Sequence, residues 1–133
     1  MPSRNASLVN SQATLRVTIG IGAVTIDDVV AVARRDATVI IDSSAREAIS
    51  ASRAVIDALS TDTQPHYGIS TGFGALANTF IEADRRIQSQ QSLIRSHAAS
   101  SGAEVERETI RALMLLRLST LATGRTGVRL STV

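Results

Sequence analysis

The sequence predicts a mainly α-helical domain with a small β contribution near the N-terminus. Two short runs rich in β-branched residues, 15–20 and 37–42, are typical of strands. Longer stretches between and after these runs carry the start and stop signals of helices. Hydrophobic residues make up 44% of the 133 residues and charged residues 20%, a globular balance, whereas aromatic residues make up only 2%. The core is therefore expected to be aliphatic.

The first elements follow from local patterns. Residues 1–14 are polar and are expected to form a flexible N-terminus, which leaves 15–133 as the folded domain. The run at 15–20 alternates apolar and polar residues, as a half-buried strand does. The segment 25–35 is predicted to be a helix, because Thr25 is a suitable N-cap, acids fill the first turn and arginines the last.

Three further helices are predicted, at about 43–59, 83–99 and 104–123. Asp42 or Ser43 would cap the first of them, and Gly102 and Gly124 would end the other two. The last helix is apolar around most of its circumference. Its large apolar side chains are Ile110, Leu113, Met114, Leu115, Leu116, Leu118 and Leu121. A helix of this kind is buried on nearly all sides, so the chain is expected to be a partial domain of a larger helical assembly.

The segment 60–80 lacks apolar periodicity and is long for a connection in a compact domain. Its stretch "HYGISTGFGALANTF" holds the only tyrosine and three of the eight glycines. Gly72, Gly74 and Ala77 match a dinucleotide fingerprint, but the preceding residues are polar and a helix follows, so this interpretation is disfavoured. Two interpretations stay open: a surface loop whose glycines permit turns, or a loop that carries Tyr67 into a cleft for proton transfer.

The charge pattern argues against a nucleic-acid partner. All 14 basic residues are arginine and they are set against 12 acids, so the formal net charge is only +2. The sequence pI near 10.4 reflects the absence of lysine and cysteine and not a strong positive field. With no cysteine and two separated histidines, no metal site is expected. No secretory signal or membrane span is recognisable, so a cytoplasmic protein with no membrane partner is expected.

Three blocks of the sequence resemble the aromatic amino acid ammonia-lyases, and most closely the histidine ammonia-lyases. They are "YGISTGFGALA" at 67–77, "QSQQSLIRSHAASSG" at 88–102 and "RALMLLRLSTLATGRTGVR" at 111–129, in the order expected of that family. Together they cover most of residues 65–130. The resemblance implies a large helical-bundle lyase, of which this chain would be the N-terminal part.

The resemblance also assigns roles to single residues. It implies that Tyr67 is the catalytic base that removes the β-proton of the substrate, and that the loop at 60–80 is an active-site lid. The lid residues carried over from the family motif are Gly68, Gly72, Phe73 and Gly74. Ser96 and His97 match the pair that sorts substrates: members specific for histidine have Ser-His there, those specific for tyrosine His-Leu and those specific for phenylalanine Phe-Leu. His66 receives no role and is expected to be an exposed loop residue.

The sequence departs from the family pattern in three places. Ser70 stands where many members have asparagine, and "TGRTGVR" is an uncommon form of the glycine turn. The family's electrophile is a 4-methylideneimidazole-5-one (MIO) group made from an internal Ala-Ser-Gly, and no such tripeptide occurs in the 133 residues. The isolated chain is therefore predicted to be inactive, and no cofactor is expected to be bound by it.

The activity implied for the parent enzyme is the non-oxidative deamination of L-histidine to trans-urocanate and ammonia, by a homotetramer. The alternatives are a tyrosine or phenylalanine ammonia-lyase, an aminomutase of the same family, or a non-enzymatic helical module that oligomerises through 105–122.

Overall fold

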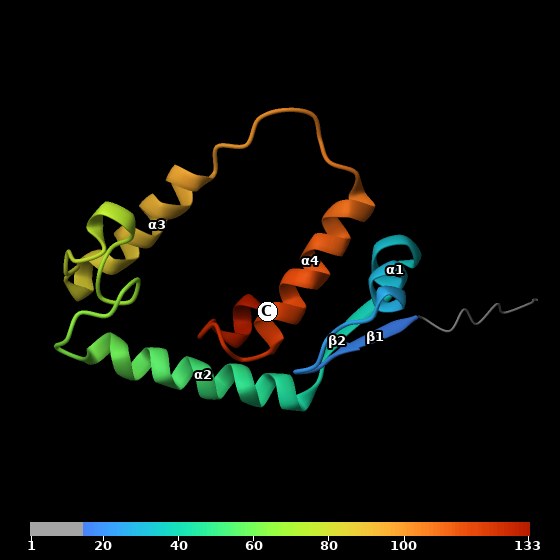
Figure 1. Ribbon diagram of the computed structural model, residues 1–133, viewed down its shortest axis with the longest axis horizontal. Coiled ribbons are helices and arrows are strands. Elements are labelled where there is room, and N and C mark those ends of the chain that lie inside the picture. The colour runs from blue at the N-terminus through green and yellow to red at the C-terminus, as the bar shows by residue number, and fades with distance from the viewer. Residues whose placement is uncertain (1–14) are drawn as a thin grey trace, which may run out of the picture.

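The computed structural model describes residues 15–133, and the predicted flexible N-terminus lies outside the described residues. The helices and strands are, in chain order, β1 (Arg16–Ile19), α1 (Ile26–Arg35), β2 (Thr38–Ile41), α2 (Ser43–Thr61), α3 (Arg86–His97) and α4 (Arg107–Ala122). Figure 1 shows these elements arranged as an open ring, with α2 along one side, α3 on the next and α4 running back toward the sheet. The prediction of a mainly α fold with a small N-terminal β contribution is confirmed.

The two strands form a parallel pair, with Arg16 opposite Thr38 and Ile19 opposite Ile41. Parallel neighbours need a crossover connection, and α1 supplies it. Side chains of β1 alternate as the sequence predicts, because Val17 and Ile19 are buried. The core is aliphatic and lies between the sheet, α1 and α4. Its buried members are Val17, Ile19, Ala31, Val32, Ala37, Ala45, Leu115 and Ala122.

Helix α1 begins at the cap that the sequence predicts. The Thr25 hydroxyl accepts a hydrogen bond from the Asp28 backbone N–H at 3.1 Å, and the Asp28 carboxylate accepts from the Thr25 N–H at 2.9 Å. The Thr25 hydroxyl also donates to this carboxylate at 2.7 Å, and this bond, followed by that from the Thr25 N–H, lowers the pKa of Asp28. The helix ends at Asp36, whose φ of 54° is left-handed. Its carboxylate accepts from Arg107 at the start of α4 at 2.7 Å, which ties the ends of the two helices together.

Helix α2 is capped by Asp42, which accepts a hydrogen bond from the Ser44 backbone N–H at 2.6 Å. Its middle supports the turn that follows α4. The Gly127 N–H donates to the Ser52 hydroxyl at 2.9 Å. Gly124 has a φ of +69°, and a Cβ placed on it would lie 2.6 Å from the backbone of Ala48. This turn can approach α2 so closely only because it has no side chains at these positions.

Helices α3 and α4 are shorter than predicted, because 98–106 forms a connection and not the ends of two helices. Glu106 has φ −56° and ψ 140°, dihedral angles that delay the start of α4 to Arg107. Helix α3 has no buried residue, and only three residues of α4 are buried. Among the exposed apolar side chains of α4, Leu113 is 63% and Met114 65% accessible. The chain alone therefore covers only one side of its most apolar helix.

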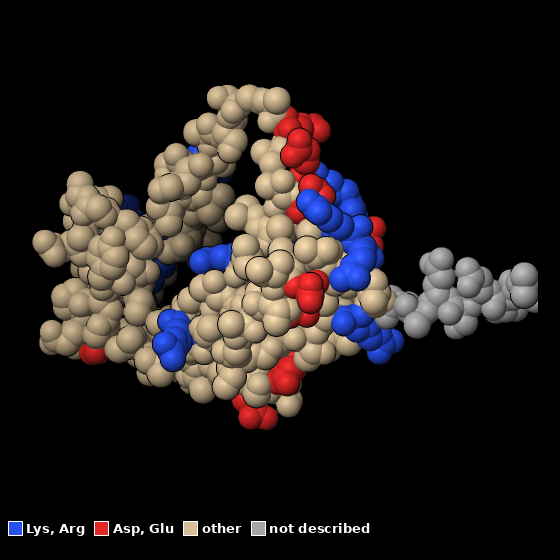
Figure 2. All heavy atoms as spheres, turned by 45° about the vertical axis from the view of Figure 1, so that its right-hand side comes forward, with Lys and Arg blue, Asp and Glu red and all other residues tan. Residues whose placement is uncertain are grey.

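Positive and negative side chains are mixed at the end of the molecule where α1 meets α4 (Figure 2). Arg34 lies 2.9 Å from Glu108 and Arg107 lies 2.7 Å from Asp36. Opposite charges therefore compensate one another at this end of the described residues. Between residues 15 and 133, no helix has the length and apolar character needed to cross a bilayer.

Candidate active site

The loop between α2 and α3 is folded around its own backbone. The carbonyl oxygen of His66 accepts hydrogen bonds from the N–H groups of Ile69, Ser70 and Thr71, at 3.0 to 3.3 Å. The His66 N–H in turn donates to the Ser70 hydroxyl at 2.9 Å. Ser70 and Thr71 are buried, with 0% and 4% of their surface accessible. A serine in place of the family's usual asparagine therefore takes a structural position inside the loop.

Further contacts close the two ends of the loop. Residues Thr71 and Phe80 form an antiparallel bridge, in which the Ile81 N–H donates to the Ser70 carbonyl at 2.8 Å. At the start of α3, Arg86 donates to the carbonyl of Ser60 at 2.6 Å and to that of Ile81 at 3.0 Å. Its guanidinium also lies 5.7 Å from the centroid of the Phe80 ring. One arginine thus joins the last turn of α2, the end of the loop and the first turn of α3.

Tyr67 lies on the surface of this loop and is 65% accessible. Its ring meets the ring of Phe73 edge to face, with centroids 5.8 Å apart and planes at 82°. That arrangement is favourable for two aromatic quadrupoles and orients the phenol. The hydroxyl has no hydrogen-bond partner among residues 15–133, so it is available to a molecule that approaches the loop.

The three glycines of the loop are needed for different structural reasons. Gly68 has a φ of +70°, and a Cβ placed on it would lie 2.8 Å from Cε1 of Phe73. Gly72 is buried, and a Cβ there would lie 2.6 Å from Cβ of Leu76. Gly74 has a φ of +56° but no atom within 4 Å of the position of a Cβ. Gly68 and Gly72 therefore allow close contacts with neighbouring side chains, whereas Gly74 allows only a left-handed backbone conformation.

His66 differs from the expectation of an exposed residue, because its side chain is only 27% accessible. Its Nε2 atom lies 2.8 Å from the carboxylate of Asp62, one helical turn earlier in the sequence. The hydrogen bond from His66, followed by that from the Gln64 N–H, lowers the pKa of Asp62. This pair is missed from the sequence alone, because a spacing of four residues indicates an ion pair only on a helix and α2 ends at Thr61.

Ser96 and His97 form the end of α3 and are exposed. The Ser96 hydroxyl donates to the Leu93 carbonyl at 2.8 Å, and His97 Nδ1 lies 2.9 Å from the same oxygen. The Ser96 oxygen and His97 Nδ1 are 3.1 Å apart. The pair is thus anchored to one backbone carbonyl near the end of α3.

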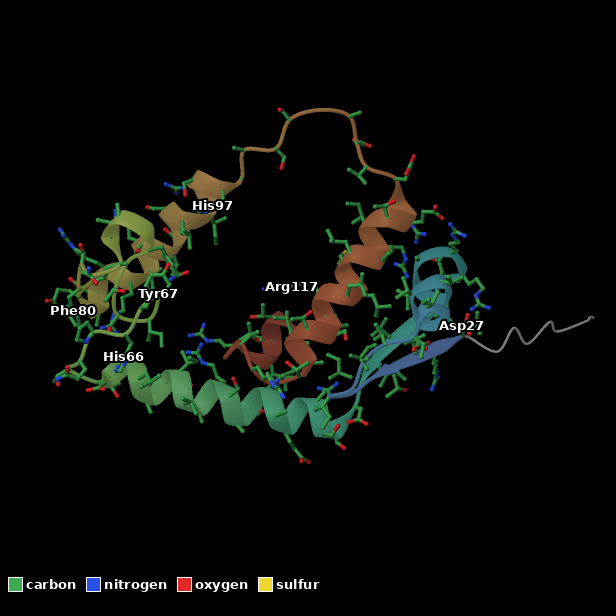
Figure 3. All side chains as sticks on the ribbon, in the orientation of Figure 1. Asp27, His66, Tyr67, Phe80, His97 and Arg117 are labelled. Atoms are coloured by element: carbon green, nitrogen blue, oxygen red, sulfur yellow. The ribbon has the colours of Figure 1, made fainter. Side chains whose placement is uncertain are left out.

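Figure 3 places Tyr67 in the loop and His97 at the end of α3 that leads into the connection. The loop leads directly into α3, so the structure brings the candidate base and the candidate selector onto one lobe, residues 62–97. No described residue encloses them. A groove of about 820 Å³ lies elsewhere, between α1, β2 and α4, and neither residue lines it. Among residues 15–133, no histidine, aspartate or glutamate side chains cluster in a metal-binding arrangement.

Comparison with known proteins identifies relatives of this chain. A model of the family described as "Aromatic amino acid lyase" matches residues 24–133. The histidine ammonia-lyase of Streptomyces griseus is 52% identical over 113 residues, which is 85% of this chain and 22% of that protein. The histidine ammonia-lyase of Streptococcus pyogenes serotype M1 is 42% identical over 109 residues, 82% of this chain and 21% of that protein.

Two solved structures are also similar. The histidine ammonia-lyase from Trypanosoma cruzi superimposes with a TM-score of 0.78 at 37% identity, over 89% of this chain and 22% of that one. Tyrosine aminomutase from Streptomyces globisporus superimposes with a TM-score of 0.80 at 29% identity, over 86% of this chain and 22% of that one. The chain thus spans about a fifth of the length of its curated relatives. By this match over most of its residues, the chain belongs to the aromatic amino acid lyase family.

Proposed function

We propose that this chain carries the base and the substrate selector of a lyase that deaminates L-histidine to trans-urocanate and ammonia. The observation that supports it most is the lobe formed by the loop and α3, which presents Tyr67 and the Ser96-His97 pair on neighbouring elements. The relatives described as histidine ammonia-lyases, at 42% and 52% identity, favour histidine over other aromatic amino acids.

In this proposal the Tyr67 oxygen, in its phenolate form, takes the β-proton of the substrate, and the electrons of that C–H bond form the alkene. The C–N bond at the α-carbon breaks, and its electron pair leaves with the nitrogen as ammonia. The proton now on Tyr67 passes to solvent or to the leaving ammonia, which restores the phenolate. Phe73 restricts the phenol by its edge-to-face contact. The His97 ring meets the imidazole ring of the substrate, which distinguishes it from an apolar benzene ring.

The family implies an electrophilic MIO group, which makes the amino group of the substrate a better leaving group. It is made from Ala-Ser-Gly, and the 133 residues contain no such tripeptide. The residues of this chain therefore do not supply that group. The proposal places it in sequence outside these residues, and predicts that the 133-residue chain alone forms no urocanate from histidine.

The decisive experiment is Tyr67→Phe in the full-length lyase that carries this segment. The substitution removes only the hydroxyl and keeps the ring contact with Phe73. Substrate binding should therefore be retained, and only the rate of proton transfer should fall. We expect kcat to fall by about 10²- to 10⁴-fold, the usual contribution of a general base. Formation of urocanate from histidine is the measurement. The matched control is Phe80→Leu, an aromatic change at the other end of the loop that leaves the hydroxyl in place; full activity of Tyr67→Phe would refute the proposal.

A second candidate is an aminomutase, which the likeness to the tyrosine aminomutase of Streptomyces globisporus favours. The products separate the two: an aminomutase returns a β-amino acid, whereas a lyase releases ammonia and the alkene. A homotetrameric assembly and a cytoplasmic location belong to the main proposal, as the family implies. Gel filtration with light scattering on the full-length enzyme measures the assembly.

A further inference from the structure

We infer that Ser96 is a positioning residue that, with the Leu93 carbonyl, fixes neutral His97 as the tautomer protonated on Nδ1. The Nε2 atom of His97 is then a hydrogen-bond acceptor that is available to the ring of the substrate. This inference rests on the proposed function and deepens it, because it states which feature of a substrate ring the selector reads.

The hydrogen-bond partners favour one arrangement of protons on neutral His97. The Leu93 carbonyl oxygen can only accept, and it lies 2.9 Å from His97 Nδ1, so Nδ1 carries the proton. The Ser96 hydroxyl has one proton, which it donates to the same carbonyl at 2.8 Å. Its lone pairs remain for Nδ1–H at 3.1 Å. With Nδ1 unprotonated, two lone pairs would face each other across 2.9 Å.

The consequence falls on the other ring nitrogen. In neutral imidazole one nitrogen donates and the other accepts, so His97 Nε2 is an acceptor. It has no hydrogen-bond partner among residues 15–133. An imidazole N–H or a phenol O–H can pair with it, whereas a benzene ring leaves it unsatisfied once the site is closed. A substrate whose ring has no hydrogen-bond donor should therefore have a kcat/KM about 10- to 100-fold lower than a substrate whose ring has one.

The second histidine of the chain provides an internal reference. His66 Nε2 lies 2.8 Å from the Asp62 carboxylate, which accepts only, so neutral His66 carries its proton on Nε2. The two histidines should thus be opposite tautomers. Long-range ¹H–¹⁵N spectra of the labelled chain, at about pH 8, where ordinary histidine is neutral, separate the two forms. We expect one ring protonated on Nδ1 and one on Nε2, and Nε2 protonation in both rings would overturn the inference.

Substitutions assign the effect to the Ser96 hydroxyl. Ser96→Ala should raise the share of the Nε2–H tautomer of His97 and leave His66 unchanged. Ser96→Thr keeps a hydroxyl and should restore the Nδ1–H form, and Ser92→Ala, an exposed serine one turn earlier, is the matched control. An unchanged His97 spectrum in Ser96→Ala would contradict the role of this residue.

Kinetics of the full-length enzyme give the second readout. Ser96→Ala should raise KM for histidine several-fold with a smaller change in kcat, and Ser96→Thr should reverse most of it. A several-fold fall in kcat in Ser96→Ala, with KM for histidine unchanged, would overturn the positioning role. The spectra need no activity, so a wrong tautomer refutes this inference alone, whereas an active Tyr67→Phe enzyme refutes the proposed function.

Discussion

Single residues determine the conformation of the loop at 66–80. Two of its glycines, Gly68 and Gly74, look alike in sequence but differ in the space around them. Gly68 and Gly74 both have positive φ, which costs a side chain about 1–2 kcal/mol. Only at Gly68 would an added Cβ meet another group, the ring edge of Phe73 at 2.8 Å. Gly68 therefore determines where the Tyr67–Phe73 pair can sit, whereas Gly74 only turns the chain.

This difference predicts unequal effects of alanine at the two positions. Gly68→Ala should displace Phe73 and free the Tyr67 ring, whereas Gly74→Ala adds backbone strain alone. The chain has one tyrosine and no tryptophan, so its near-ultraviolet circular dichroism near 275–280 nm, roughly where phenols absorb, reports on Tyr67. We expect this signal to fall in Gly68→Ala and to persist in Gly74→Ala. Equal signals in the two variants would show that the contact with Phe73 does not hold the ring.

At the scale of elements, the fit between α2 and the turn after α4 depends on the absence of side chains. A Cβ on Gly124 would lie 2.6 Å from the carbonyl carbon of Ala48, and helix backbone cannot move aside as a flexible side chain can. The left-handed φ of +69° adds strain. The closure of α4 onto α2 therefore depends on this residue.

Gly124→Ala should lower the free energy of unfolding by about 2–4 kcal/mol, from strain and overpacking together. Gly22→Ala is the control, because Gly22 has no atom within 4 Å of the position of a Cβ. Removing a glycine there should leave stability unchanged or slightly raised. Urea denaturation followed by far-ultraviolet circular dichroism measures both variants. A Gly124→Ala chain as stable as the parent would mean that α4 does not close on α2 in solution.

Local signals predicted most of the elements, and contacts distant in sequence decided the rest. The strands, the Thr25 cap, the Asp42 cap and the glycine after α4 each depend on neighbours a few residues away, so the sequence alone is sufficient for them. The junction made by Arg86 joins carbonyls 26 and 5 residues away, which no periodicity reveals. The candidate base and the candidate selector were proposed from the family motif, because one exposed tyrosine has no local pattern of its own.

At the scale of the whole molecule, five carboxylates stabilise the folded state only while they are ionised. Hydrogen bonds from Thr25, Arg107, Ser44, Arg53 and His66 lower the pKa values of Asp28, Asp36, Asp42, Asp57 and Asp62, respectively. A lowered pKa in the folded state means that the stabilisation is complete above the unfolded value of about 3.9 and is lost as the pH falls through the folded value.

The thermal midpoint of the chain should therefore fall steeply below about pH 4. Asp36→Asn should weaken this acid dependence, because it removes the carboxylate that Arg107 and Arg111 face. Asp84→Asn is the matched control, since the Asp84 side chain has no ion pair or hydrogen bond among the described residues. Thermal scans between pH 2 and 7, roughly the range over which carboxylates titrate, test the prediction. Identical acid dependence in the parent and Asp36→Asn would exclude this contribution.

The exposed apolar side of α4 predicts the behaviour of the chain in solution. Exposed apolar patches of this kind mark surfaces that associate. We expect the 133-residue chain to self-associate as its concentration rises. Leu113→Glu should weaken that association, whereas Val55→Glu, at an exposed apolar position on α2, should leave it unchanged. Sedimentation velocity measures both, and a stable monomer at all concentrations would contradict the role of α4.

The bonds from Arg86 have a mechanical consequence for the molecule. Because one guanidinium fastens the end of α2 and the closing strand of the loop to the start of α3, this junction holds the loop and α3 against the end of α2. The phenol of Tyr67 and the imidazole of His97 therefore share one anchored support. Loss of this single junction would release both side chains from their present positions relative to α2.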